Sequence, residues 1–204
     1  MMLPTVYLAA EDVPGLAVGR KLLAEHPKLS IYREENGHGY GRLRRKTPNY
    51  NQMGSRGIPV LMLTDLDDDP CPSDKIMDWL GNAPSRGFLF RICVREVEAW
   101  LLADRPAMAE FLRIKEDRLP TAPEGLDDPK AELIKLAQAA PRKTRVGLTP
   151  IGLAAIGPDY NDLLSSFIAD SWSITRAADR APSLRRARQR VSKLAALVAS
   201  EATS

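Results

Sequence analysis

Acidic side chains closely follow three apolar segments of this 204-residue chain. Glu11 comes directly after VYLAA, Asp65 and Asp67 come after VLMLT, and Glu98 comes shortly after RICV. Carboxylate oxygens are the ligands that Mg²⁺ prefers, and carboxylates that face one spot repel each other unless a cation or a proton neutralises them. If the fold brings these residues together, the chemistry they indicate is metal-assisted attack on a phosphodiester.

The segment VLMLTDLDDDP, residues 60–70, carries the densest group of these acids. Side chains two positions apart in a strand share a face, so Asp65 and Asp67 are predicted to point the same way, about 6–7 Å apart. Asp68 and Asp69 are assigned to the turn that follows, and Asp69 is the weaker candidate for a site. Taken alone, the segment fits an ordinary solvated turn as well as a cation site.

Four segments with the pattern of strands, three of them apolar and one alternating, are the elements that must position these acids. The predicted strands span 6–10, 28–34, 58–65 and 87–94, and the pattern is helical from Glu96 onward. This order predicts an α/β fold with a small, mainly parallel sheet flanked by helices and a helical C-terminal half. The carboxyl ends of parallel strands meet at one edge of a sheet, where α/β folds bind their ligands.

The predicted division of the chain is an α/β core over residues 1–105 and a helical region over 106–204 that packs on the core. A single domain is the alternative. Residues 36–57 contain five glycines, one proline and several bases, and they are predicted to form a loop. That loop precedes the strand that ends at Asp65, so its bases are well placed to reach a substrate.

Glu96 and Glu98 flank Val97 at the start of the predicted helix EVEAWLLAD. Acids in a first helical turn interact favourably with the helix dipole, which explains both residues without a site. Trp100 and its neighbours have the character of core residues, so Glu98 belongs to a buried helix start. An ionised side chain is costly at a buried position, and we therefore predict that Glu98 is a site residue.

The formal net charge is only +3, but basic residues gather in three runs, GRLRRK (41–46), PRKTR (141–145) and SLRRARQRVSK (183–193). Such patches fit contact with an anionic partner such as DNA or RNA. The predicted substrate-binding residues, three in the predicted loop and one after the DDP turn, are Arg44, Arg45, Lys46 and Lys130. The last run is interpreted as a packed helix with a solvated basic face, and nucleic-acid binding is its alternative.

Hydrophobic residues make up 44% of the chain and charged residues 27%, values typical of a folded globular protein. No apolar stretch approaches the roughly 20 residues that cross a bilayer, and MMLPTVYLAAEDVPG lacks the basic n-region of a signal peptide. Cys71 and Cys93 have no metal-ligand spacing and suggest no disulfide framework. These features predict a cytoplasmic protein without a membrane segment.

The order of Glu11, then Asp65-Leu66-Asp67, then Glu98 resembles the Toprim domain of topoisomerases, primases, OLD-type nucleases and the short nucleases that mature ribosomal RNA. In Toprim domains a glutamate follows the first strand and an Asp-x-Asp follows the third, and together they organise Mg²⁺. This chain departs from the pattern at Asp12, because Toprim nucleases usually have glycine after the glutamate.

A longer pattern, over most of residues 1–195, resembles a bacterial family catalogued as domain of unknown function 4276, which is considered Toprim-like. It comprises DLDDD, EVEAWLLADRPAMAEFL, DDPKAEL, IGPDYNDLLSSFI and PSLRRARQR. The most telling part is EAWLLAD followed by DDPK. Members of that family often occur beside ATPases in mobile or phage-defence loci.

The resemblance implies a nuclease that depends on Mg²⁺ or Mn²⁺ and acts on DNA or RNA. It implies that Glu11, Asp65 and Asp67 are metal ligands, that Glu11 is a ligand or the general base, and that Glu98 completes or orients the site. A partner ATPase would be a separate chain, because the sequence has no Gly-x-x-x-x-Gly-Lys motif. The alternative is a non-catalytic Toprim-like module that binds protein or nucleic acid, and phosphatase or small-nucleotide hydrolase chemistry would use the same acids.

Overall fold

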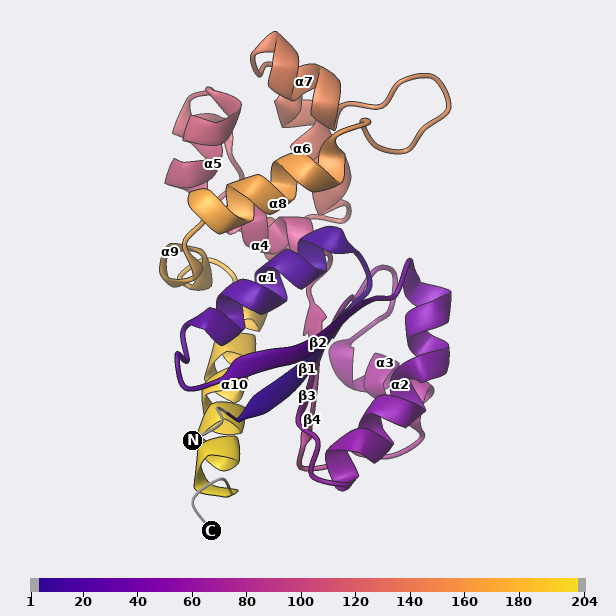
Figure 1. The fold of residues 1–204 in the computed structure, drawn as a ribbon. Coiled ribbons are helices and arrows are strands. Elements are labelled where there is room, and N and C mark those ends of the chain that lie inside the picture. Colours follow the sequence, from indigo (N-terminus) through magenta and orange to yellow (C-terminus); the bar gives the residue numbers. More distant parts are fainter. Residues whose placement is uncertain (1–3, 202–204) are drawn as a thin grey trace.

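The sheet has four parallel strands, as predicted. In this computed structural model, which describes residues 4–201, their order is β2-β1-β3-β4 (Figure 1). The strands are β1 (Thr5–Ala10), β2 (Ser30–Asn36), β3 (Val60–Asp65) and β4 (Phe88–Cys93). β3 is buried along its whole length between β1 and β4, and Asp65 lies opposite Cys93. The α/β class is therefore confirmed, and β1 and β3 are neighbours in the sheet.

Helices cover both faces of the sheet. Along β3, Leu61 and Leu63 belong to one core cluster, whereas Val60 and Met62 belong to the other, because successive strand residues point to opposite faces. The first cluster includes residues of α1 (Val13–Ala24) and α10 (Pro182–Glu201). The second includes residues of α2 (Tyr40–Ser55) and α3 (Pro72–Leu80). Figure 1 shows these two pairs on opposite sides of the strands.

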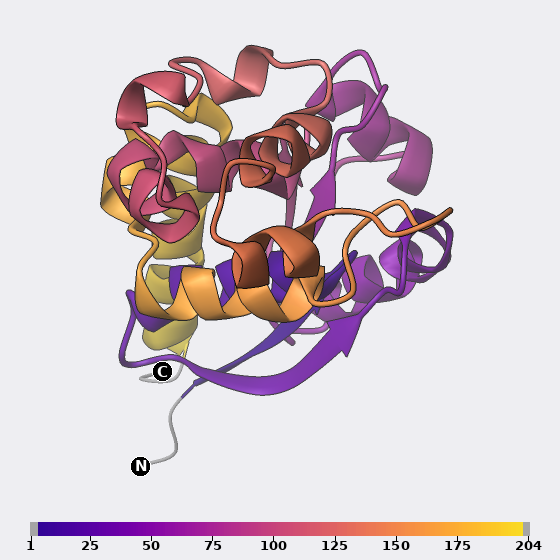
Figure 2. The same cartoon turned by 90° about the horizontal axis from the view of Figure 1, so that it is seen from above.

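The C-terminal half is helical and lies beyond the carboxyl ends of the strands before α10 returns to the sheet (Figure 1). Its other helices are α4 (Val97–Ala103), α5 (Arg105–Leu112), α6 (Pro129–Ala137), α7 (Arg142–Leu148), α8 (Tyr160–Asp170) and α9 (Ile174–Ala178). Figure 2 shows α8 alongside α1, and one core cluster continues from the sheet into these helices. Within residues 4–201, no helix is both long and apolar enough to cross a membrane. The ends of the predicted regions 1–105 and 106–204, residues 1–3 and 202–204, lie outside the described chain.

The prediction of a loop over residues 36–57 is wrong, because most of this segment forms α2. Its buried face consists of Leu43, Thr47, Tyr50 and Gly54, spaced by three or four residues as one side of a helix requires. Gly54 is not a loop residue but a packing residue. A Cβ at the facing Gly87 would lie 2.5 Å from the Gly54 carbonyl oxygen, so the two backbones touch only because both residues are glycine.

Ser183, at the start of α10, links this helix to Trp100 of α4 and to Glu124. Its hydroxyl accepts a hydrogen bond from Trp100 Nε1 at 2.6 Å and donates one to Glu124 Oε1 at 2.6 Å. Ser183→Ala is expected to lower the free energy of unfolding by about 1–3 kcal/mol, because a buried indole N–H loses its acceptor. Urea unfolding followed by circular dichroism measures the change. Ser192→Ala, on the exposed side of the same helix, is the control, and equal effects of both variants would contradict this role of Ser183.

Candidate metal-binding site

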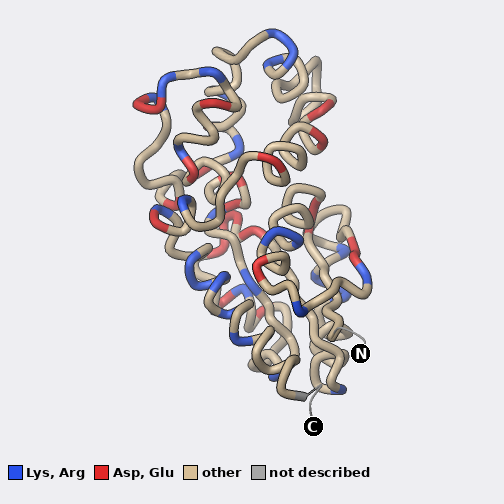
Figure 3. Tube along the Cα trace, turned by 60° about the vertical axis from the view of Figure 1, so that its left-hand side comes forward, with Lys and Arg blue, Asp and Glu red and all other residues tan. Residues whose placement is uncertain are grey.

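Three carboxylates meet at the carboxyl edge of the sheet. Asp65, Glu96 and Glu98 each offer one oxygen atom, and these oxygens all lie within 4.8 Å of one another. Asp65 ends β3, whereas Glu96 and Glu98 stand at the start of α4, directly after β4. We call these three residues the acidic triad. Figure 3 shows that acidic positions gather near the middle of the molecule.

Backbone and side-chain contacts hold each carboxylate of the acidic triad in place. Asp65 Oδ1 accepts a hydrogen bond from the Val97 backbone N–H at 2.9 Å, which ties the end of β3 to the start of α4. Glu98 Oε1 accepts one from the Tyr160 hydroxyl at 2.8 Å. The other oxygen, Glu98 Oε2, is buried and has no hydrogen-bond partner among the described residues. A buried carboxylate oxygen without a partner is costly, and a cation would satisfy it.

Lys130 is the cation that pairs with the acidic triad in the described chain. Its Nζ lies 3.0 Å from Glu96 Oε1 and 3.7 Å from Glu98 Oε1, and its backbone N–H donates to Glu96 Oε2 at 2.8 Å. Lys130 stands in the first turn of α6, which packs against α4. One ammonium against three carboxylates leaves an excess of negative charge in a buried place, which favours a further cation or a proton.

Burial dominates the protonation of Asp65 and Glu98. Loss of solvent contact raises the pKa of Glu98 to about 7, and Glu96 adds to the rise while Lys130 opposes it. Burial also raises the pKa of Asp65 well above its usual range, with Glu98 as the next cause. For Lys130 the opposite holds: burial by itself lowers its pKa, but the neighbouring carboxylates, Glu98 first, outweigh burial and raise it. The carboxylates thus resist ionisation unless a cation is present.

The raised pKa of Glu98 predicts that the metal-free protein loses stability as the pH rises. Between the ordinary value of 4.5 and about 7, the folded state holds a proton that the unfolded state releases. The free energy of unfolding is therefore expected to fall by about 3 kcal/mol across this window, and Glu98→Gln should remove most of that slope. Chemical denaturation with a chelator at several pH values measures it. Glu110→Gln, at an exposed position, is the control, and an unchanged slope in Glu98→Gln would contradict the assignment.

Glu11, a predicted metal ligand, lies beside the acidic triad but is not one of its three members. Its Oε2 accepts a hydrogen bond from the Thr64 hydroxyl at 2.6 Å, and its backbone N–H donates to the Leu63 carbonyl. Burial raises the pKa of Glu11, and the charge of Asp67 adds to the rise. The carboxyl ends of β1 and β3 thus bring Glu11 near Asp65, whose own pKa it raises further.

Asp67 does not share a strand face with Asp65, and this geometric expectation is wrong. β3 ends at Asp65, and Asp67 adopts a left-handed backbone conformation with φ of 54°. Its Oδ2 accepts a hydrogen bond from Lys75 Nζ at 3.1 Å, and Lys75 also pairs with Asp69 at 3.0 Å. Because Lys75 is fully buried, these two acids serve to neutralise it. Asp67 lies beyond the end of the strand, so the strand period does not govern its direction.

The predicted substrate-binding bases lie in two different parts of the structure. Lys130 lies at the acidic triad, as described, whereas Arg44, Arg45 and Lys46 belong to α2 and not to a flexible loop. Arg44 pairs with Asp78 at 2.9 Å, and Lys46 pairs with Glu35. Arg45 is exposed. Among the described residues, none of these three bases contacts the acidic triad.

Glu96 is absent from the predicted site because the helix dipole explains an acid in a first helical turn. Glu96 is indeed the N-cap residue of α4, but its side chain makes no capping hydrogen bond and turns to Lys130 instead. The available signal was the pair of motifs EVE and DDPK, whose acid and base meet in the fold.

Comparison of the chain with family models, curated proteins and solved structures found no match.

Proposed function

We propose that this protein is a nuclease that uses Mg²⁺ or Mn²⁺ to hydrolyse phosphodiester bonds of DNA or RNA. The observation that carries the proposal is the acidic triad with its unpartnered oxygen, Glu98 Oε2. The donor set fits the metal, since Mg²⁺ takes carboxylate oxygens and keeps several waters. The resemblance to Toprim domains supports the same conclusion, because those domains place acids at corresponding strand ends.

The residues around the acidic triad have distinct proposed roles. Asp65, Glu96 and Glu98 hold the metal ion, which when bound polarises a phosphoryl oxygen and lowers the pKa of a coordinated water. Glu11, whose pKa is raised by burial, accepts the proton of the attacking water. Lys130 balances the negative charge of the triad and of an incoming phosphate.

A cleavage assay tests the proposal. Fluorescently labelled single-stranded DNA, duplex DNA and RNA are incubated with the protein and Mg²⁺, Mn²⁺ or a chelator. At least one polymer is expected to be cut with either metal and none with the chelator. A parallel thermal-shift titration with Mn²⁺ alone is expected to raise the melting temperature. If no polymer is cut and Mn²⁺ leaves the melting temperature unchanged, the proposal is wrong.

A non-catalytic Toprim-like module is the second candidate, and one observation favours it. Lys130 and Lys75 already pair with acids at this edge of the sheet, so part of the negative charge is neutralised within the chain. Such a module is expected to bind nucleic acid or a partner protein without cleaving the polymer under any metal. A separate ATPase is the partner that the family resemblance suggests, and co-purification of the tagged chain with an ATPase from the same cells tests that association.

A further inference from the structure

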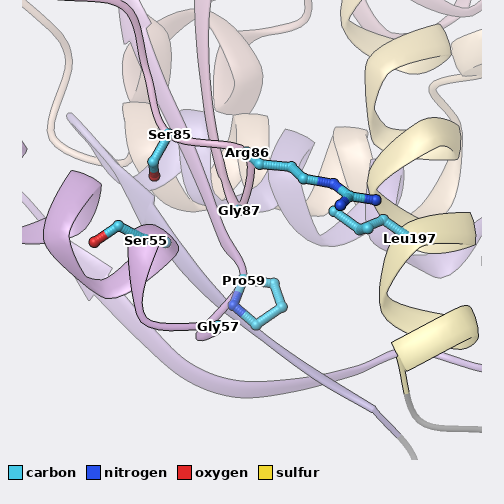
Figure 4. Close-up of a pocket in the computed structure, with 8 residues that line it drawn as sticks. Ser55, Gly57, Pro59, Ser85, Arg86, Gly87 and Leu197 are labelled. Atoms are coloured by element: carbon cyan, nitrogen blue, oxygen red, sulfur yellow. The ribbon is translucent and has the colours of Figure 1, made fainter. Parts of the chain in front are cut away.

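A groove follows the seam between β4, at the edge of the sheet, and α10. Three pockets with volumes of 280 to 330 Å³ make up this groove. They adjoin, because the middle pocket shares lining residues with each of the other two. It shares Arg190 and Lys193 with one neighbour, and Arg86 and Leu197 with the other. Figure 4 shows Arg86 extending from the loop before β4 toward Leu197 on α10. From Arg186 to Leu197 the helical wall is about 16 Å long.

Among the described residues, the lining of the groove includes bases and no acid. Arg86, Arg91, Arg186, Arg190 and Lys193 line its pockets, and among residues 4–201 none of the five forms a salt bridge. By contrast, Arg188 on the same helix pairs with Glu25 at 2.8 Å. Figure 3 shows basic positions recurring along the lower left of the molecule.

Arg91 lies on the β4 face that packs toward α10. Its Nε is buried and has no hydrogen-bond partner in the described chain. Burial lowers the pKa of Arg91, and the charges of Arg190 and Arg186 lower it further. Arg186 and Arg190 are four positions apart and therefore share one side of the helix. Like charges held together in this way destabilise the fold, and a bound anion would relieve the repulsion.

The shape of the groove indicates a polymer of anions. A single phosphate would need one pocket, whereas five bases on the two walls of a groove about 16 Å long match a chain that carries one charge at each repeat. The aromatic residue among the lining side chains, Phe88, is only 3% exposed and offers no face for stacking on a base. Recognition would therefore rest on phosphates and not on bases.

We propose that the groove between β4 and α10 binds the sugar–phosphate backbone of a nucleic acid. The proposal rests on the proposed function for its choice of polymer and adds the surface that holds the substrate. Arg91 precedes Cys93, the strand partner of Asp65, by two residues. A backbone lying in the groove therefore runs along β4 toward the edge of the sheet that carries the acidic triad, and Cys93 is about 7 Å from Arg91 along the strand.

Binding is tested in the presence of a chelator, so that cleavage plays no part. Fluorescence anisotropy measures the affinity of the full chain for labelled single-stranded and duplex DNA and for RNA over a range of salt concentrations. Arg186→Glu/Arg190→Glu is expected to weaken binding at least about tenfold. It should also reduce the slope of log affinity against log salt by about 1.8 for duplex and 1.4 for single strands, because two phosphate contacts are lost.

Arg142→Glu/Arg145→Glu, at exposed positions of α7, is the matched control with the same change of charge. Wild-type affinity in Arg186→Glu/Arg190→Glu, or an equal loss in the control, would overturn the proposal. Binding of tripolyphosphate without binding of any polymer would overturn the assignment to nucleic acid. If charge reversal unfolds the helix, Arg186→Gln/Arg190→Gln takes its place. Groove-dependent binding without metal-dependent cleavage would refute only the proposed function, and cleavage with unchanged binding would refute only the groove.

Discussion

Asparagine in place of Asp65 is expected to lower metal-dependent cleavage at least about 100-fold while the fold persists. Changes to groups that merely support a metal ligand already cost about 10–100-fold in affinity or activity, so loss of a ligand should cost more. The fold should persist because the amide oxygen of the substituted side chain can still accept the hydrogen bond that the Val97 backbone N–H donates to Asp65. Removing a buried charge also relieves repulsion from Glu98. Initial cleavage rates and the Mn²⁺-dependent thermal shift measure the two consequences.

Asp68→Asn is the matched control for Asp65→Asn. It makes the same chemical change three residues along the same acidic run, at an exposed position for which the described chain has no ion pair. Near wild-type cleavage is expected. Equal losses in the two variants would mean that the overall negative charge of the run matters and that the acidic triad is not the catalytic centre.

Methionine in place of Lys130 is expected to destabilise the metal-free protein by about 2–4 kcal/mol near neutral pH. Removing one partner of a buried ion pair leaves the other charge uncompensated, which typically costs about 3–5 kcal/mol. The expected value is at the low end because 31% of the Lys130 side chain is exposed, while Glu98 is fully buried. Chemical denaturation in the presence of a chelator measures the loss.

The stability lost in Lys130→Met, measured as the decrease in the free energy of unfolding, is expected to become smaller as the pH falls. Asp65 and Glu98 have raised pKa values, so these two acids take up protons on acidification and need the ammonium group less. Added Mn²⁺ should restore stability more in Lys130→Met than in the wild type, because a ligand that binds the folded state stabilises it by mass action. Lys135→Met, at an exposed position of the same helix, is the control. A loss that neither acid nor Mn²⁺ reduces would argue for a packing role of Lys130.

Much of the fold followed from local pattern. The four strands were predictable because three of their segments are apolar runs and the segment of β2 alternates, and polar residues bound each pattern. α2 was missed because its glycines and Pro48 mimic loop chemistry. Its helical spacing of Leu43, Thr47 and Tyr50 was present in the sequence, but Gly54 acquires its meaning only against Gly87.

The sequence by itself determined that acids follow the ends of three predicted strands and that bases occupy the last helix outside its apolar face. Only the tertiary structure decided which of them meet. Asp65 lies near Glu98 because β3 and β4 are paired. The chain turns after Asp65, and Asp67 therefore forms a salt bridge with Lys75. Glu96 and Lys130 are 34 residues apart and meet because α4 packs on α6. Strand and helix periods govern direction over a few residues, and contacts between elements depend on how whole faces pack.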